Sequence, residues 1–173
     1  MRATHLLVSL AIIASSALGC GATVEVPRFC LTQPGVVIPG SPVGGDFTTP
    51  PLLQVELNDQ IPLLRIDSSD TDVRMDTVTI TPVAGAPDLS GIQSATVRAQ
   101  PASGPAVELA QYQRDPAAPA PAAIVFQGGN QNITPFLVAG QANLSFAFSG
   151  QPPRTDWTAD IETCMHGEAT ARP

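Results

Sequence analysis

The stretch Ala142-Asn143-Leu144-Ser145-Phe146-Ala147-Phe148-Ser149 places large apolar side chains at every second position. This period of two is typical of a β-strand with one face in a protein core. After the turn Gly150-Gln151-Pro152-Pro153, residues 157–162 alternate in the same way. We therefore expect two strands that pair as a hairpin. The side chains expected to share one core are Leu144, Phe146, Phe148, Trp157 and Ile161.

Upstream, short apolar or alternating runs are separated by clusters of Pro, Gly, Asn and Asp. This pattern predicts an all-β chain, a single immunoglobulin-like β-sandwich of about eight strands. Segments 33–51 and 115–121 are rich in Pro with Gly or Ala, and we expect them to be loops. The remaining expected strands are residues 23–31, 52–57, 72–81, 92–99, 107–112 and 122–126.

One of these strands changes phase within its length. Val73 and Met75 lie on odd positions, whereas Val78 and Ile80 lie on even ones, so a regular strand would not bury all four. The sequence predicts a β-bulge near Asp76-Thr77, which would bring both pairs to the same face.

The chain of 173 residues has 15 acidic residues and 8 basic ones, which gives a formal net charge of −7. Every basic residue is Arg, and the arginines are scattered singly. Because nucleic-acid affinity depends on neutralising phosphates, no nucleic-acid partner is expected. The lack of Lys also excludes Schiff-base catalysis.

The N-terminal segment has a positive start at Arg2, an apolar run over residues 6–18 and the box Ala17-Leu18-Gly19-Cys20. The apolar run is shorter than the roughly 20 residues that cross a bilayer as a helix. The segment resembles a bacterial lipoprotein signal peptide. The resemblance implies cleavage after residue 19, acyl chains on the sulfur of Cys20, and a β-sandwich domain with a short tether over residues 20–173.

The same resemblance predicts an exported protein that reaches the membrane through its N-terminal lipid. Gly21 stands where an Asp would signal retention in the inner membrane, so we expect the outer membrane of a two-membrane bacterium. Ala17 and Gly19 also satisfy the rule for an ordinary secretory signal, and in that alternative Cys20 carries no lipid.

The chain has three cysteines, which is an odd number for an exported protein. If Cys20 carries lipid, Cys30 and Cys164 remain, and we expect a disulfide between them that joins the two ends of the domain. The alternative is a pair of reduced, buried thiols.

Candidate catalytic and metal sites are few. The acidic stretch over residues 67–72, with Asp76 beyond it, has oxygen ligands of the kind that calcium prefers, but it lacks the EF-hand spacing. His166 follows Cys164 by two residues, but an oxidised Cys164 offers no thiolate. We therefore expect no metal, no cofactor and no catalytic residue, and a surface position for His166 with no acidic or hydroxyl partner aligned in a cleft.

These observations favour a non-enzymatic module that binds or scaffolds an envelope protein or polysaccharide. The first alternative is an envelope hydrolase, for which two converging carboxylates in a cleft would be the discriminating feature. The second is a carrier of a small apolar ligand, which would need a cavity of several hundred Å³ between the sheets.

Overall fold

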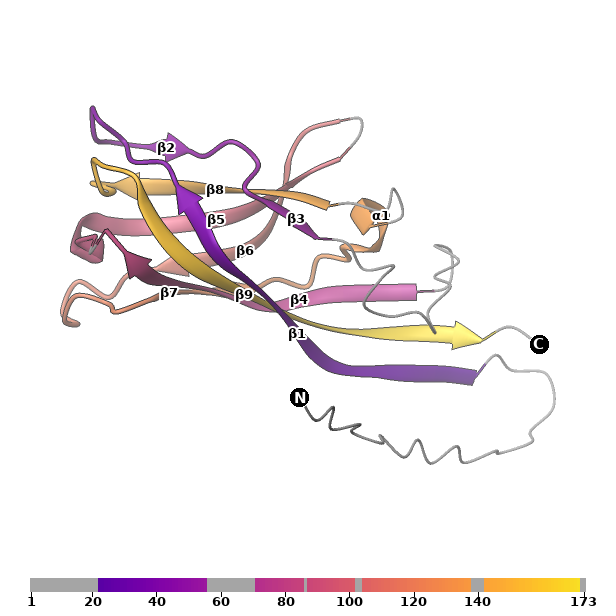
Figure 1. Ribbon diagram of the computed structural model, residues 1–173. Coiled ribbons are helices and arrows are strands. Elements are labelled where there is room, and N and C mark those ends of the chain that lie inside the picture. Colours follow the sequence, from indigo (N-terminus) through magenta and orange to yellow (C-terminus); the bar gives the residue numbers. More distant parts are fainter. Residues whose placement is uncertain (1–21, 56–70, 86, 102–103, 138–141, 172–173) are drawn as a thin grey trace, which may run out of the picture.

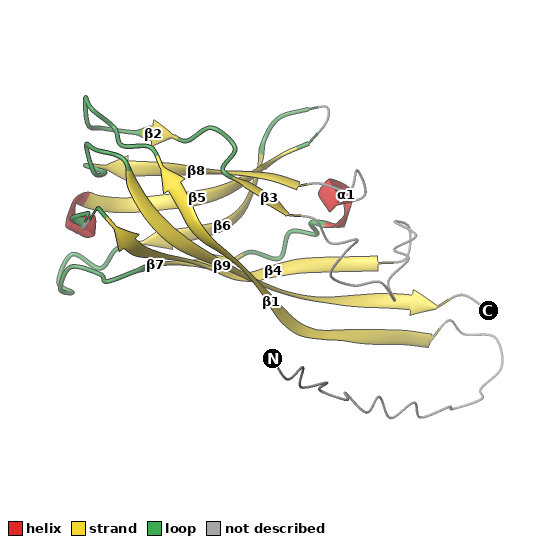
Figure 2. Ribbon diagram, viewed as in Figure 1, coloured by secondary structure: helices red, strands yellow, loops and turns green. Residues whose placement is uncertain are grey.

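The computed structural model describes residues 22–55, 71–85, 87–101, 104–137 and 142–171 (Figure 1). These residues are almost entirely β-structure, as Figure 2 shows, so the predicted all-β class is confirmed. The strands are β1 (Ala22–Ile38), β2 (Phe47–Thr48), β3 (Leu53–Val55), β4 (Thr71–Ala84), β5 (Ile92–Gln100), β6 (Val107–Gln113), β7 (Ile124–Gly128), β8 (Ala142–Gly150) and β9 (Trp157–Ala171). Two short helical elements accompany them, a 3-10 turn at Leu89–Gly91 and α1 (Thr134–Leu137).

The nine strands belong to one antiparallel sheet with the order β1-β9-β4-β7-β6-β5-β8-β2, while β3 pairs with β8 beside β2. The expected hairpin between β8 and β9 is wrong. Both edges of β8 are filled, by β5 on one side and by β2 and β3 on the other. Both edges of β9 are likewise filled by β1 and β4. The connection through Pro152 and Pro153 therefore carries the chain between distant parts of the sheet.

The sheet curls so that its two halves face each other across a single core. In the sheet order, β7 and β8 are separated by β6 and β5, which places them roughly 14 Å apart along the sheet. Yet the rings of Phe126 on β7 and Phe146 on β8 have centroids only 5.8 Å apart. Their side chains therefore meet across the core, as in a sandwich.

The predicted core residues of β8 and β9 are confirmed. The core includes Leu144, Phe146, Phe148, Trp157 and Ile161, each no more than 3% exposed. The period-two alternation thus identified the buried face of both strands correctly, although it did not identify their partners.

The predicted bulge in β4 is confirmed. Register shifts between Met75 and Thr77 against β9, so Asp76 is the extra residue. Val73 and Val78 are consequently both buried although they lie in opposite phases. Because Asp76 is the extra residue at the bulge, its side chain does not follow the regular alternation of the strand.

β1 is longer than predicted, because it continues to Ile38 into the expected loop. Its pairing with β9 is broken twice, between Val26 and Phe29 and between Gln33 and Val36. Each break contains a proline, Pro27 or Pro34, which has no N–H to donate to the ladder. After Pro34, Gly35 adopts a φ of 68° and donates its N–H to Asp160 Oδ1 at 2.9 Å.

Candidate functional site

The structure contains a disulfide between Cys30 and Cys164, so that part of the prediction is confirmed. The two residues are direct partners in the β1–β9 ladder, with Cα atoms 4.0 Å apart. Their separation of 134 residues in sequence joins the first strand to the last.

The disulfide also settles the nature of one potential metal cluster. Among the described residues, one group of candidate metal ligands comes together: Cys30, Glu162 and Cys164. Glu162 Oε1 lies 3.7 Å from Cys164 Sγ, but a disulfide sulfur has no hydrogen to donate and is no thiolate ligand. We therefore assign this cluster a structural role.

Cys20, with the predicted signal peptide, lies outside the described residues. Within the described part of the chain, no helix has the length and apolar character needed to cross a membrane.

His166 lies on the outward face of β9, between the bulge of β4 and the first bulge of β1. Its Nδ1 contacts Asp76 Oδ1. Asp76 Oδ2 is 3.3 Å from Arg28 Nε, and Arg28 Nη2 donates to Thr77 Oγ1 at 3.2 Å. These residues, which we call the His166 cluster, connect the three neighbouring strands β1, β9 and β4.

His166 is exposed and has a carboxylate beside it. Its side chain is 47% exposed, so the surface position is confirmed. The bulge turns Asp76 toward the imidazole, so His166 has an acidic neighbour, but the pair lies on an exposed strand face. Asp76 also pairs with Arg28, whose side chain is 58% exposed, so the cluster is a solvated cross-strand network. Exposed ion pairs of this kind contribute about 0–1 kcal/mol to stability.

The acidic stretch proposed as a metal site is only partly described, because residues 67–70 lie outside the described part. Asp72 receives two hydrogen bonds from Arg74, at 3.3 Å from Nε and 2.7 Å from Nη2. This hydrogen bonding, with the carboxylate charge, raises the pKa of Arg74 above its ordinary value. Asp72 and Asp76 are therefore both engaged by cations of the protein itself.

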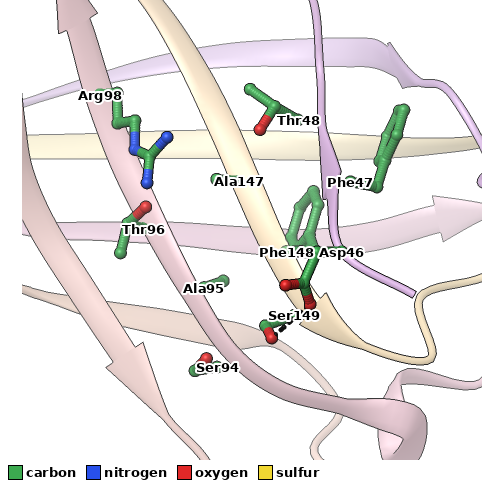
Figure 3. A pocket seen from close by; sticks show the side chains of 10 residues that line it. All are labelled: Asp46, Phe47, Thr48, Ser94, Ala95, Thr96, Arg98, Ala147, Phe148 and Ser149. Atoms are coloured by element: carbon green, nitrogen blue, oxygen red, sulfur yellow. Dashed lines mark hydrogen bonds between the residues drawn. The ribbon is translucent and has the colours of Figure 1, made fainter. Parts of the chain in front are cut away.

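A pocket of about 340 Å³ lies over β5, β8 and β2, and it is partly open to solvent (Figure 3). We call it the β2 hollow. The pairing register places its residues in rows across the sheet. Thr96 on β5 pairs with Ala147 on β8, and Ala147 pairs with Thr48 on β2. The small Ala147 at the centre of this row leaves room between two threonines. The lining comprises Asp46, Phe47, Thr48, Ser94, Ala95, Thr96, Arg98, Ala147, Phe148 and Ser149.

The hollow lies on the outer face of the sheet and not in the core. Along β5, Ala95 and Val97 are buried, whereas Ser94, Thr96 and Arg98 are partly exposed. The outward-facing side chains of this strand are therefore the polar ones, and they form one wall of the hollow.

The two ends of the hollow differ in charge. At one end, Asp46 accepts a hydrogen bond from Ser149 Oγ at 2.6 Å. At the other end stands Arg98, which forms no ion pair with any described residue. In Figure 3 its guanidinium is directed along β5 toward Thr96. The arrangement can receive a ligand with an anionic group at one end and hydroxyl groups at the other.

The Thr96 hydroxyl is an unsatisfied group within this site. Thr96 Oγ1 is buried and has no hydrogen-bond partner among the described residues. Such a group costs about 1–3 kcal/mol relative to a satisfied one. Buried polar atoms without partners are rare in native proteins, and a bound ligand is one way of satisfying them.

The β2 hollow was not predicted, because residues 33–51 were expected to be a loop. The signal that was available is the short β-favouring run Phe47-Thr48-Thr49, which precedes Pro50. Its pairing is reinforced by Thr49, whose N–H donates to Phe146 O at 2.8 Å and whose Oγ1 accepts from Phe146 N at 3.0 Å.

Comparisons with known proteins assign no family to the chain. No protein-family model matches it, and no curated protein matches its sequence. Among solved structures, a crystal structure of the decameric BFDV capsid protein is similar over 88% of this chain and 99% of that chain, with 14% identity and a TM-score of 0.30. A similarity at this level carries no argument about function, so the fold description rests on the strands and their pairing.

Proposed function

We propose that the protein is a lipid-anchored envelope protein whose β-domain acts as a non-enzymatic binding or scaffold module at the outer membrane. The observation that carries the proposal is the distribution of the three cysteines. Cys30 and Cys164 form a disulfide, which leaves Cys20 in the box Ala17-Leu18-Gly19-Cys20. Acylation gives this third sulfur a role that needs no protein partner.

The start of β1 supports the same proposal. β1 begins at Ala22, directly after the proposed acylation site and Gly21. A lipid on Cys20 would therefore hold the first strand close to the membrane surface, with little tether between them. The negative net charge of the chain disfavours electrostatic attachment to anionic lipid, so the acyl chains would provide the attachment.

A non-enzymatic role agrees with the geometry of the described titratable groups. A carboxylate-centred hydrolase needs two converging acids, but the lining of the β2 hollow includes the single carboxylate of Asp46. The pKa of Asp88 is lowered because Ser90 donates hydrogen bonds to it, which is a helix-capping role. The His166–Asp76 pair lies on an exposed strand face, and Arg28 competes for the same carboxylate.

The anchoring is tested by intact mass spectrometry and membrane fractionation of the protein expressed with its own N-terminus. The proposal predicts a chain that begins at Cys20 with added acyl mass, and a membrane-bound protein that Cys20→Ala releases into the soluble fraction. The matched control is the double variant Cys30→Ala/Cys164→Ala, which should stay in the membrane fraction. An unacylated chain, or one that begins at another residue, would exclude the lipoprotein assignment.

A further inference from the structure

We propose that the β2 hollow binds an acidic sugar unit, a hexuronate, with its carboxylate on Arg98 and its ring hydroxyls on the Thr and Ser side chains. This inference rests on the proposed function, because it names the chemical class of ligand for the binding module. Its physical basis is a small hollow lined by one cation without an ion-pair partner among the described residues, several hydroxyls and one carboxylate.

The size of the hollow favours a small ligand. Its volume of about 340 Å³ lies at the lower end of the range for small-molecule sites, roughly 300–1,000 Å³. Arg98 lies four positions after Ser94 along β5, which is about 13 Å of strand. The long side chain of Arg98 is directed back along this strand toward Thr96 and shortens the open length (Figure 3). The remaining space suits a single sugar ring.

Arg98 would bind the anionic group of the ligand. A guanidinium binds a carboxylate through two parallel N–H···O bonds, and such bonds are stronger than those between neutral groups. Glu108 is the cross-strand partner of Arg98 on β6, but among the described residues no carboxylate lies within ion-pair distance of Arg98, so the guanidinium can turn to a ligand. One carboxylate on the ligand matches the single cation in the lining.

The other polar side chains match the hydroxyls of a sugar better than they match apolar groups. Thr96 Oγ1 is covered and has no partner among the described residues, so it can donate one hydrogen bond and accept another once Arg98, which is directed toward it, turns to the carboxylate. Asp46, already oriented by Ser149, keeps lone pairs that accept from further hydroxyls. Thr48 and Ser94 complete the set of hydroxyls around the ring position.

Ala147 makes the cavity possible. It stands between Thr96 and Thr48 in the row across β5, β8 and β2. A larger side chain at this central position would occupy the volume that the ring needs. Ala147→Leu is therefore a variant that blocks the site sterically while it leaves every polar group in place.

The position of the hollow suits a protein held at its N-terminus. β2 lies at the end of the molecule opposite to the start of β1 (Figure 1). A lipid attached just before β1 would leave the β2 hollow at the distal end of the domain, where an envelope polysaccharide has access to it.

The test is isothermal titration calorimetry on the purified full protein, in detergent if it is acylated, with sodium glucuronate as the probe. Glucose, sodium acetate, inorganic phosphate and triglycine are titrated in parallel. We expect saturable binding of glucuronate that is at least about tenfold tighter than binding of the other four compounds, since only glucuronate offers both the carboxylate and the hydroxyls.

Variants locate the binding site. Arg98→Gln should weaken glucuronate binding about tenfold or more, whereas Arg28→Gln removes an equal charge on β1 and should change it less than about twofold. Thr96→Val should weaken binding about threefold or more, and Ala147→Leu should abolish it. Circular dichroism and the unfolding midpoint verify that each variant is folded.

Several results would overturn the inference. They are equal binding of glucose, tighter binding of phosphate or triglycine, no heat with glucuronate at tens of millimolar, or binding that Ala147→Leu leaves intact. These outcomes are independent of anchoring, because the membrane fraction of the protein and the acyl mass on Cys20 are measured separately. A protein that is acylated but does not bind glucuronate would retain the proposed function and lose this inference.

Discussion

Removal of the Cys30–Cys164 disulfide should lower the free energy of unfolding by several kcal/mol. The perturbation is Cys30→Ala/Cys164→Ala in a Cys20→Ala background, so that no thiol remains to form dimers. The disulfide closes a loop with a sequence separation of 134. In the chain-entropy model, a loop of this length restricts the unfolded chain by about 5 kcal/mol, which is an upper figure.

The expected loss is therefore about 2–5 kcal/mol, a large part of the stability of an ordinary domain, about 5–15 kcal/mol. Loss of the buried Cys164 sulfur adds a packing cost, whereas loss of the sulfur of the exposed Cys30 adds little. Most of the lost stability should therefore come from the greater conformational freedom of the unfolded chain without the crosslink.

The assay is equilibrium unfolding in urea, followed by the fluorescence of Trp157, the only tryptophan and one that is 3% exposed in the folded state. The Cys20→Ala protein is measured in its oxidised form and again with a reductant, and the reduced form should unfold at a midpoint close to that of the double variant. The denaturant slope should rise when the crosslink is removed, because the unfolded chain then exposes more surface. A loss below about 1 kcal/mol, or an unchanged midpoint in reductant, would refute the reasoning.

Three further predictions concern packing and pH. Phe146→Ala should cost about 3–5 kcal/mol in urea unfolding, because Phe146 is fully buried between Phe126 and Phe148; a loss under about 1 kcal/mol would contradict the described core. Gly128→Ala should destabilise the protein by at least about 1–3 kcal/mol, because a Cβ there would overlap the carbonyl oxygen of Met75. The control is Gly129→Ala, which should be close to neutral, because the nearest atom to a Cβ at that position would be 3.6 Å away. Asp88→Ala should lower the midpoint of thermal unfolding near neutral pH, because it removes the acceptor that caps the 3-10 turn. Hydrogen bonds from Ser90 lower the folded pKa of Asp88, so the contribution of Asp88 to stability is present above the unfolded pKa of about 3.9 and is lost as the pH falls through the folded pKa. A difference in midpoint between wild type and variant that grows on acidification would contradict this assignment.

The positions of most strands were predictable from the sequence, β2 and the end of β1 excepted, but their partners were not. Alternation along residues 142–149 identifies the buried face, because the side chains of a strand point to opposite sides in turn. It contains no information on which strand lies beside it. The hairpin prediction for β8 and β9 failed because each strand is paired on both edges with strands distant in sequence. Such pairings depend on the closure of the whole sheet.

Some features of the site were likewise predictable from the sequence, and others were not. The disulfide was predictable from a count of three cysteines, and the bulge at Asp76 from the phase change between Met75 and Val78. The contact between Asp76 and His166 was not predicted, because it depends on the exact register of β4 against β9. The β2 hollow was not predicted because its third wall, β2, has only two residues. A strand of that length carries no measurable alternation.

The two prolines of β1 have a consequence for how copies of this protein can be crowded together. Among the described residues β1 ends the sheet order, and a strand of 17 residues at the edge of a sheet is a template for sheet growth between molecules. Its ladder is irregular at Pro27 and Pro34, and Arg28 and Glu25 add exposed charge. A second chain would therefore not find a flat, continuous row of partners. The irregularities of β1 are a safeguard against fibre formation, and they would matter most where many copies are concentrated in one plane.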